Sequence, residues 1–260
     1  LDRSSAASDV YKRQIPILLT SSVIAHDKGV RLQDPGERER LALESIQAWR
    51  RIAPLNPLVL CDGSGFDFQT HVTTLPGSGP VECLHFQNDV QRVQLQGRGY
   101  GEGEIVRHAL EHSRLIQAAN CFAKCTSKLW VQNFAACMQA WNGRLLMKAV
   151  FNNVFSLRKP ATLAYIDTRF YAMDVVTYCQ HFLHAHEAIR TDAGYGLEES
   201  FCDIFLREQL QGCLMNPPPV ICGVGGGTGV YYKNSWLRQY KEKWRYQRTK
   251  RNPLFRHWFA

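Results

Sequence analysis

The sequence predicts a single α/β domain in which a mostly parallel central sheet is flanked by helices. Three observations predict it. Short apolar runs with the length of buried strands alternate with longer segments of helical periodicity along most of the 260 residues. The first strand, helix and second strand form a β-α-β unit, whose geometry makes the two strands parallel. A hydrophobic content of 45% is sufficient for a full core.

The first 14 residues, LDRSSAASDVYKRQ, are excluded from the fold prediction because they resemble the translation of a sequencing adapter. The domain is expected to span residues 15–232, and a basic aromatic tail is expected over 233–260. A targeting segment upstream of Ile15 would not be visible in this sequence.

The first β-α-β unit follows from apolar runs and helix caps. Residues 15–22 and 57–62 are the predicted strands, and each is followed by small polar residues. A helix is predicted over 33–52, because Asp34 can cap it, with proline at the first helical position and glutamate three residues beyond the cap. Pro54 ends this helix.

A glycine-rich stretch at the centre of the chain, residues 97–133, is the first candidate for a binding site. It is predicted to begin as a turn at Gly97, Gly99, Gly101 and Gly103, to continue as an amphipathic helix, and to end in a strand over 121–131. Glycines let a backbone approach a ligand closely, and a helix start offers free N–H groups to an anion. The alternative is a glycine-rich surface turn before an ordinary helix.

The remaining elements are predicted from the same periodicities. A strand is expected over 81–86 and a loop over 87–96. Helices are expected over 136–153, 172–186 and 196–210. Further strands are expected over 161–166, which ends in Asp167-Thr168-Arg169, and at 220–222, which leads into the glycine cluster 223–229.

Charge is concentrated at the C-terminal end. The net charge is +8, and residues 233–260 contain nine Lys/Arg and one acidic residue, which leaves the rest of the chain neutral with 22 of each sign. The body therefore lacks the general basic excess of a nucleic-acid groove. Cations interleaved with aromatic residues suit an anionic lipid surface, but they also suit RNA or a helix packed on the domain. All three interpretations of the tail are kept.

Polar residues near predicted element ends supply the other candidate site groups. Arg169 can clamp a phosphate with Asp167 orienting it, or the two can form a local ion pair. Glu198 and Glu199 begin a helix, so one can face inward as a general base while the other stays in water, or both can be plain helix-start acids. The cluster around Thr228 can present N–H groups to a diphosphate or be a flexible loop.

Several other chemistries lack sequence support. A dinucleotide fingerprint that started at Gly97 would have Glu102 at its third glycine, and no phosphate-binding P-loop motif, zinc-binding HExxH or G-x-S-x-G elbow is present. The nine cysteines form no CxxC pair, which favours buried thiols in a reducing compartment. No apolar run approaches the roughly 20 residues of a membrane span.

Eight short motifs follow one another in an order that resembles a known group of proteins. They are ILLTSS, DPGERERLALESIQAW, LVLCDGSGFDF, GRGYGEGEIVRHALEHS, FAKCTSKLWVQN, IDTRF, GYGLEESF and GVGGGTGVYY. This order resembles bacterial and viral glycosyltransferases of GT-A type associated with capsular or surface polysaccharide synthesis, over nearly all of residues 15–232. The resemblance implies a single GT-A-like, Rossmann-like domain. Where such proteins usually have K-x-T-G-R, residues 124–128 are KCTSK, so lysine replaces the planar arginine fork.

The resemblance also implies roles for individual residues. Glu198 is the expected acceptor base, and Asp167 is a second catalytic candidate that could serve as a lone metal ligand. The expected substrate-binding residues are Thr20, Ser21, Asp62, Gly99, Gly101, Glu102, Lys124, Thr126, Lys128, Arg169, Gly226 and Thr228. Many GT-A enzymes hold Mn²⁺ or Mg²⁺ with an Asp-x-Asp motif, which this sequence lacks. Two alternatives are therefore left open: a bound Mn²⁺ or Mg²⁺ without a predicted ligand set, or neutralisation of the leaving diphosphate by Lys/Arg instead.

The sequence as a whole predicts a glycosyltransferase that moves a sugar from a nucleotide-sugar donor to a glycan or lipid-linked acceptor. A cytoplasmic protein is expected, with the tail attaching it peripherally to the inner membrane. The alternatives are a nucleotidyltransferase on a similar fold and a non-catalytic nucleotide- or RNA-binding protein, although the neutral body disfavours nucleic acid.

Overall fold

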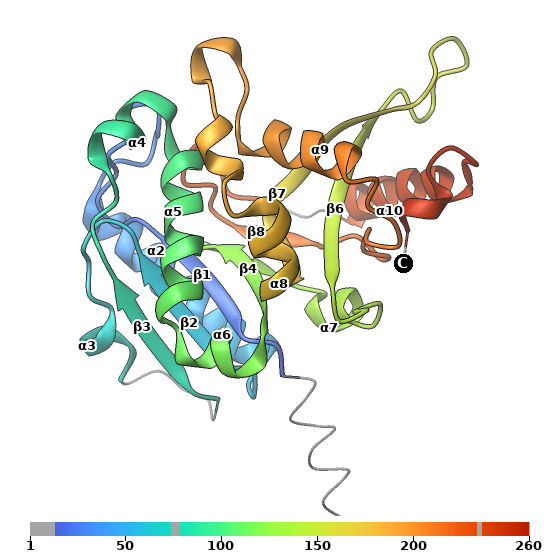
Figure 1. Ribbon diagram of the computed structural model, residues 1–260. Coiled ribbons are helices and arrows are strands. Elements are labelled where there is room, and N and C mark those ends of the chain that lie inside the picture. Colours follow the sequence, from blue (N-terminus) through green and yellow to red (C-terminus); the bar gives the residue numbers. More distant parts are fainter. Residues whose placement is uncertain (1–13, 74–78, 233–235, 260) are drawn as a thin grey trace, which may run out of the picture.

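A six-stranded sheet forms the centre of the molecule (Figure 1). The computed structural model describes residues 14–73, 79–232 and 236–259, so residues 1–13 of the predicted adapter-derived segment lie outside it. The order of the strands is β3-β2-β1-β4-β7-β6. The first four pair in parallel, whereas β7 is antiparallel to both of its neighbours. Their bounds are β1 Ile17–Ser21, β2 Leu58–Asp62, β3 Val81–His85, β4 Cys121–Thr126, β6 Leu145–Asn152 and β7 Thr162–Asp174. The predicted α/β class with a mostly parallel sheet is confirmed.

Elements with strong local signals form where they are predicted. Helix α2 spans Pro35–Ile52, and the Asp34 side chain accepts a hydrogen bond from the N–H of Glu37 at 2.7 Å. Helix α9 spans Leu197–Arg207, within the range predicted from its acidic start. The first three strands also agree with the prediction to within two residues at each end.

The glycine turn was predicted incorrectly. Only Gly97, with φ 78°, makes the turn, and helix α5 begins at the next residue and spans Arg98–His112. Gly99, Gly101 and Gly103 therefore lie inside the helix, where they allow neighbouring segments to pack against its backbone. A Cβ on Gly103 would lie 2.3 Å from the His186 side chain. The predicted loop before the turn also contains a helix, α4 (Val90–Gln96), which the Asp89 side chain caps.

The middle of the chain contains more strand than predicted. The helix expected over 136–153 is a short helix, α7 (Phe134–Met138), followed by strand β6, with Gly143 at φ 79° between them. Strand β7 continues eight residues past Ile166, so the segment 167–169 lies within the strand rather than after it. The helix expected over 172–186 is replaced by the end of β7 and three short turns, α8 (Val175–Thr177), η1 (Tyr178–Phe182) and η2 (Ala185–Ala188).

The strand predicted over 121–131 is two strands. After β4, the chain turns at Lys128, and β5 (Leu129–Val131) pairs with β8 (Ile221–Gly223) in a separate two-stranded sheet. This pairing brings the late glycine cluster next to the end of β4, because the N–H of Val224 donates to the carbonyl of Lys128 at 3.0 Å.

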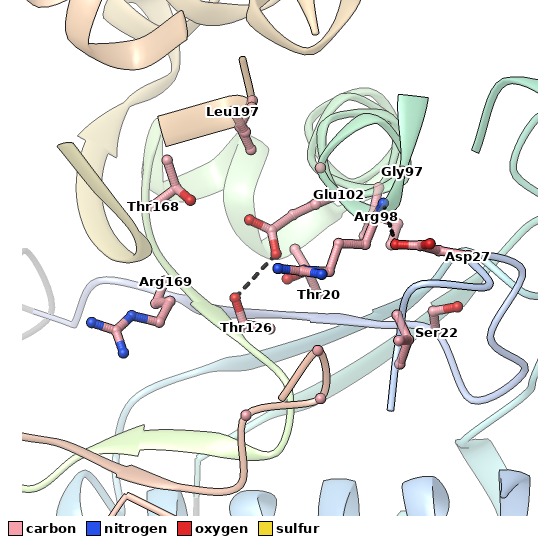
Figure 2. Close-up of a pocket in the computed structure, with 18 of the residues that line it drawn as sticks. Thr20, Ser22, Asp27, Gly97, Arg98, Glu102, Thr126, Thr168, Arg169 and Leu197 are labelled. Atoms are coloured by element: carbon pink, nitrogen blue, oxygen red, sulfur yellow. Dashed lines mark hydrogen bonds between the residues drawn. The ribbon is translucent and has the colours of Figure 1, made fainter. Parts of the chain in front are cut away.

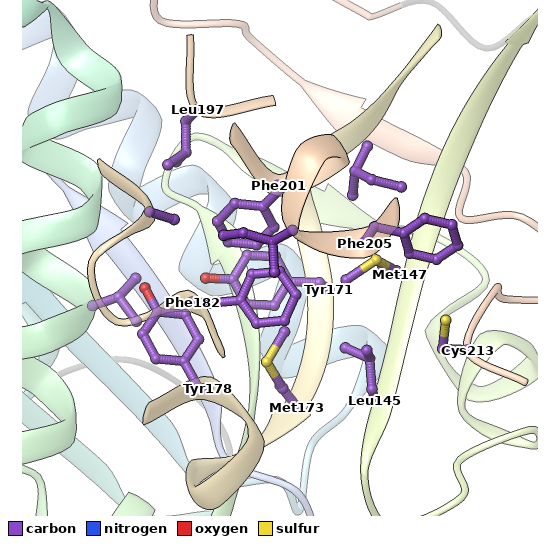
Figure 3. Packing of buried hydrophobic residues seen from close by; sticks show 14 of the residues in the cluster. Leu145, Met147, Tyr171, Met173, Tyr178, Phe182, Leu197, Phe201, Phe205 and Cys213 are labelled. Carbon is purple, nitrogen blue, oxygen red and sulfur yellow. The ribbon is translucent and has the colours of Figure 1, made fainter. Parts of the chain in front are cut away.

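Two apolar clusters cover the two faces of the central sheet. One includes α2, whose Trp49 is fully buried against Phe134 and Phe170. The other includes α5, α9 and η1, and Figure 3 shows its aromatic centre, where Phe201 packs between Tyr171 and Phe182. The remaining short elements are α3 Gln69–Val72, α6 Arg114–Ala119, η3 Thr191–Ala193 and η4 Arg256–Trp258.

The C-terminal tail is a helix whose far end joins the core. Helix α10 spans Trp236–Arg251, and Tyr246, Phe255 and Phe259 are buried in the same cluster as α9. The packed-helix interpretation therefore accounts for the second half of the tail, while Trp236, Tyr240 and Trp244 are exposed. Within the described residues, no helix is both long and apolar enough to cross a membrane.

Candidate active site

A cavity of about 700 Å³ opens at the carboxyl ends of β1 and β4 (Figure 2). Parallel α/β sheets bind ligands at this edge. The wall of the cavity also includes the start of α5, the middle of β7, the start of α9 and the glycine cluster at 225–228. Of the residues predicted for the site, all except Asp62 and Lys124 line this cavity: Thr20, Ser21, Gly99, Gly101, Glu102, Thr126, Lys128, Asp167, Arg169, Glu198, Gly226 and Thr228.

Asp62 is fully buried and organises loops rather than facing the cavity. One carboxylate oxygen accepts from the N–H of Val23 at 2.9 Å, and the other accepts from the N–H and hydroxyl of Ser64 at 2.7 and 2.6 Å. These bonds tie the loop after β1 to the loop after β2. Asp62, which was expected to bind substrate, therefore has a structural role instead.

Lys124 is also fully buried, and its ammonium group has no donor left for a phosphate. It forms an ion pair with Glu102 and donates to the Thr126 hydroxyl at 3.0 Å and to the Thr168 carbonyl at 2.8 Å. The Thr126 hydroxyl in turn donates to Glu102 at 3.0 Å. Lys124 thus fixes β4, α5 and β7 around the cavity, and its predicted phosphate contact is not supported.

The start of α5 is already occupied by a carboxylate. The N–H of Arg98 donates to Oδ2 of Asp27 at 3.1 Å, and Oδ1 of Asp27 accepts from Gly29 at 2.7 Å. Asp27 therefore occupies the positive end of the helix dipole, where the sequence predicted the diphosphate. A second place for a ligand anion lies elsewhere in the cavity.

Three cations around the glycine cluster provide that place. Arg38 is buried and donates to the backbone carbonyls of Ser22, Val23 and Leu32, but it has no carboxylate within salt-bridge distance among the described residues. Lys128 is buried beside it, and among the described residues its ammonium group donates only to the Ser127 hydroxyl, at 3.1 Å. Burial, together with the smaller effect of the neighbouring Arg38 charge, lowers the pKa of Lys128 to about 7.

The third cation is Arg98, whose side chain extends from the start of α5 into the cavity in Figure 2. A Cβ on Gly227 would lie 2.7 Å from its guanidinium carbon, and one on Gly226 would lie 3.0 Å from Cε of Lys128. The glycine cluster therefore contacts both cations directly. Within the described residues, the N–H groups of Gly226 and Gly227 make no hydrogen bond to protein. Unpaired cations and free N–H groups together form an anion site.

Glu198 faces the same cavity from the first turn of α9, where it accepts from the Thr168 hydroxyl at 3.2 Å. Burial raises the pKa of Glu198, and the negative charges of Glu102 and Asp167 add to this shift. The adjacent Glu199 instead accepts from the N–H of Gly196 at 2.9 Å and caps the helix. Both acids line the cavity, but Glu199 also caps the helix, whereas Glu198 accepts from Thr168.

Asp167 and Arg169 form a bidentate ion pair across one side of β7, with N–O distances of 2.8 and 2.6 Å. Burial alone would raise the pKa of Asp167, but its hydrogen bonds to Arg169 and the cationic charge lower the pKa below its usual value. Lys148 lies 3.8 Å from the same carboxylate. Both oxygens of Asp167 are therefore engaged by cations, and its geometry is that of a group which orients Arg169.

Unpartnered polar atoms mark the floor of the cavity. The Thr20 and Ser21 hydroxyls and Oδ1 of Asn88 are buried and have no hydrogen-bond partner within the part of the chain that the structure describes. A Cβ on either Gly63 or Gly101 would lie less than 3 Å from the Asn88 amide, so these glycines fix the position of that side chain. Buried polar atoms in a native structure are nearly always hydrogen-bonded, which makes these three atoms candidate ligand contacts.

The acidic residues here do not fit a divalent cation. Asp167, the expected lone ligand, is held by Arg169, and Glu102 is held by Lys124 and Thr126. In the described part of the chain, no three His, Cys, Asp or Glu side chains gather in a metal-binding geometry. The positive charge available to neutralise an anion in this cavity therefore comes from Arg38, Arg98 and Lys128.

No protein family model and no curated protein matches the chain. Among solved structures, a putative nucleotide-diphospho-sugar transferase from Desulfovibrio desulfuricans is similar, with 12% identity, a TM-score of 0.48, and coverage of 95% of this chain and 99% of that chain. The inositol-1-phosphate CTP transferase from T. maritima has 10% identity, a TM-score of 0.47 and coverages of 88% and 95%. HddC from Yersinia pseudotuberculosis has 9% identity, a TM-score of 0.46 and coverages of 89% and 99%. Likeness at this level shows a similar fold and no more.

Sequence reasoning did not find several residues of the cavity: Asp27, Arg38, Asn88, Arg98, Thr168 and Tyr232. Arg38 lies in the first turns of a helix, where charged residues are ordinarily solvent-exposed. Only its burial, which a tertiary structure reveals, distinguishes it. Asn88 follows the end of β3, so the rule about carboxyl ends of parallel strands was the signal that could have found it.

Proposed function

We propose that this protein is a glycosyltransferase that moves a sugar from a nucleotide-sugar donor to an acceptor hydroxyl on a glycan or lipid-linked molecule. The observation that carries the proposal is the pairing, in one cavity, of a half-buried carboxylate of raised pKa with a cluster of cations that have no carboxylate partner among the described residues. The cations suit a diphosphate, and the carboxylate suits the deprotonation of a hydroxyl.

The donor is proposed to bind with its nucleoside over β1 and its diphosphate at the glycine cluster. Thr20, Ser21 and Asn88 supply hydrogen-bonding atoms for the nucleoside. Arg38, Lys128 and Arg98 supply positive charge for the diphosphate, together with the free N–H groups beside them. The donor sugar then points toward Glu198 and Thr168 at the start of α9.

In the reaction step, Glu198 accepts the proton of the acceptor hydroxyl, and the acceptor oxygen forms a bond to the anomeric carbon. The bond from that carbon to the diphosphate oxygen breaks, and the electron pair leaves with the nucleoside diphosphate. Protonated Lys128 and the two arginines stabilise the developing charge. A raised pKa brings Glu198 closer to the range in which a carboxylate is an effective base at neutral pH.

The test combines donor binding with one substitution. A panel of UDP-, GDP-, CMP- and dTDP-sugars is expected to include a donor that raises the melting temperature and is transferred or hydrolysed. Glu198→Gln is expected to lower turnover by roughly 10² to 10⁴, with donor binding and folding unchanged. Glu199→Gln is the matched control, because it keeps the helix cap and changes turnover little.

Three results would contradict the proposal. Undiminished turnover in Glu198→Gln would show that Glu198 is not the catalytic base. Release of pyrophosphate from a nucleoside triphosphate and a sugar phosphate would identify a nucleotidyltransferase instead. Donor binding without turnover against any glycan or lipid-linked acceptor would favour the non-catalytic alternative.

A further inference from the structure

Helix α10 and the loop between β6 and β7 meet at Phe155, and we call their exposed residues together the α10–loop surface. Its residues are Phe155, Leu157, Arg158 and Lys159 of the loop, and Trp236, Leu237, Tyr240, Lys243, Trp244 and Arg248 of the helix. Trp236, Tyr240 and Trp244 are four residues apart and share one helix face. Trp244 stacks on Phe155 with ring centroids 5.0 Å apart, and the Arg248 guanidinium lies 5.8 Å from the Phe155 ring.

This surface exposes large apolar side chains, which soluble surfaces ordinarily limit. Trp236 is 74% exposed, Tyr240 65% and Trp244 55%. Leu157, at the loop between the two strands, is 96% exposed. The loop and the helix lie on the same side of the molecule as β6 (Figure 1), and Phe155 of the loop contacts Trp244 of the helix. Rings and aliphatic chains are thus presented together, rather than as isolated exposed residues.

The surface is also strongly cationic. Residues 236–251 contain seven Lys/Arg and one acid, and the loop 153–161 adds Arg158 and Lys159 with no acid. The one acid, Glu242, pairs with Lys148 of β6 at 3.1 Å and with Arg245 at 3.7 Å. Its charge therefore serves to anchor α10 on the domain and leaves the outer face positive.

We propose that the α10–loop surface docks on an anionic lipid bilayer. Trp and Tyr rings occupy the headgroup level, leucine side chains enter the acyl boundary, and Lys/Arg are attracted to the negative leaflet. This combination of aromatic rings, aliphatic side chains and cations favours a lipid bilayer over other classes of partner. Single-stranded RNA would use the rings and cations, but it gains nothing from an almost fully exposed leucine. A second copy of this face would bring like charges together.

The proposal goes beyond the proposed function and does not depend on it, because the α10–loop surface shares no residue with the cavity. It is tested with the full chain and with vesicles of phosphatidylcholine, either alone or with about 30% phosphatidylglycerol to supply the negative surface potential. The protein is expected to float with the anionic vesicles only. Raising the salt to about 0.5 M is expected to weaken binding at least several-fold, because the charges are exposed.

Point variants locate the binding on the surface. Trp244→Ala, Leu157→Ser and Arg248→Glu are each expected to weaken vesicle binding by about fivefold or more, because each removes roughly 1 kcal/mol of interfacial interaction. Leu55→Ser and Arg51→Glu are matched controls at exposed positions near the end of α2, and they are expected to leave binding unchanged. Melting temperatures confirm that each variant is folded.

Each alternative outcome overturns the proposal. Equal binding to neutral vesicles would show that charge has no role. Binding that the surface variants leave unchanged, or that the controls reduce equally, would place the contact elsewhere. Binding to a single-stranded RNA oligonucleotide without binding to vesicles would identify nucleic acid as the partner.

Discussion

Lys128 is buried in a conformation that few lysines adopt, with φ 73° and its ammonium group beside Arg38. Its pKa of about 7 in the folded chain is well below the usual 10.5, whereas the unfolded chain binds the proton normally. Between these two values the unfolded state therefore binds more protons, so stability rises with pH over that range. Burial of the Lys128 ammonium group therefore lowers the stability of the protein without ligand, and a bound anion beside it would offset that loss.

We predict that binding of a nucleoside diphosphate takes up a proton at pH 7 to 8. The anion favours the charged lysine, so the pKa of Lys128 rises on binding, and the affinity is highest below pH 7 and falls as the pH increases through 7. Titration calorimetry in buffers of different ionisation enthalpy measures the uptake. Lys128→Met is expected to abolish it and to weaken binding by at least tenfold. Unchanged uptake in that variant would contradict the assignment, and the exposed Lys159→Met is the control.

The same substitution has a predicted effect on stability without ligand. Lys128→Met removes a buried ammonium group, so the empty variant is expected to unfold at a higher temperature than the parent protein. The gain should be largest at pH 7 or below and should shrink as the pH approaches 10, because the lysine of the unfolded parent chain then also loses its proton and the two states no longer differ in protonation. Thermal unfolding at pH 6.5 and pH 9.5 measures the difference. A gain that grows with pH would contradict a depressed pKa.

At the scale of elements, local signals predicted structure better than apolar patterns did. The side chain of Asp34 and the following proline define the start of α2 wherever that helix packs, and the prediction was correct. Strand β6 was predicted as a helix because Met138, Trp141, Leu145 and Leu146 recur at helical spacing. Its residues are buried on both sides of the sheet, so they show no alternation. The Asn142-Gly143 pair was the available turn signal.

The site was predictable in part because parallel strands place their carboxyl ends at one edge of a sheet. The resemblance supplied the list of expected substrate-binding residues, and Thr20, Ser21 and Thr126 from that list lie together at this edge. The list could not distinguish side chains that face the cavity from those that face the loops, and it included Lys124 and Asp62. Each of these two makes a hydrogen bond to a residue more than 35 positions away, which no local pattern encodes.

Helix α5 illustrates the cost of close packing between elements. Gly103→Ala is expected to destabilise the protein by about 1–3 kcal/mol, because the new Cβ would lie 2.3 Å from the His186 side chain on η2. Urea unfolding measures the change. Gly36→Ala in the first turn of α2 is the control, because its Cβ would be 3.5 Å from the nearest atom, and alanine is expected to be neutral or stabilising there. Equal effects at the two positions would contradict the packing explanation.

At the scale of the whole molecule, the tail has two parts with different functions. The exposed half of α10 forms the proposed lipid-binding surface, while the end of the chain is built into the core. The N–H groups of Cys213 and Leu214 both donate to the carbonyl of Trp258 at 2.8 Å, and Phe255 packs against Phe151 at a centroid distance of 5.0 Å. A deletion of residues 233–260 would therefore remove part of the core together with the surface, so it cannot test lipid binding.

Substitution of Phe255 tests whether the C-terminal end of the chain is part of the core. Phe255→Ala is expected to destabilise the protein by about 3–5 kcal/mol, because a ring that is only 6% exposed leaves a cavity between Phe151 and Trp258. That loss corresponds to a melting temperature lower by roughly 10 °C for a chain of this size. The neighbouring Leu254→Ala, at a position 66% exposed, is expected to stay within about 0.5 kcal/mol of the parent. If both variants unfolded like the parent, the C-terminal end would be an appendage, and the deletion would become a valid test of lipid binding.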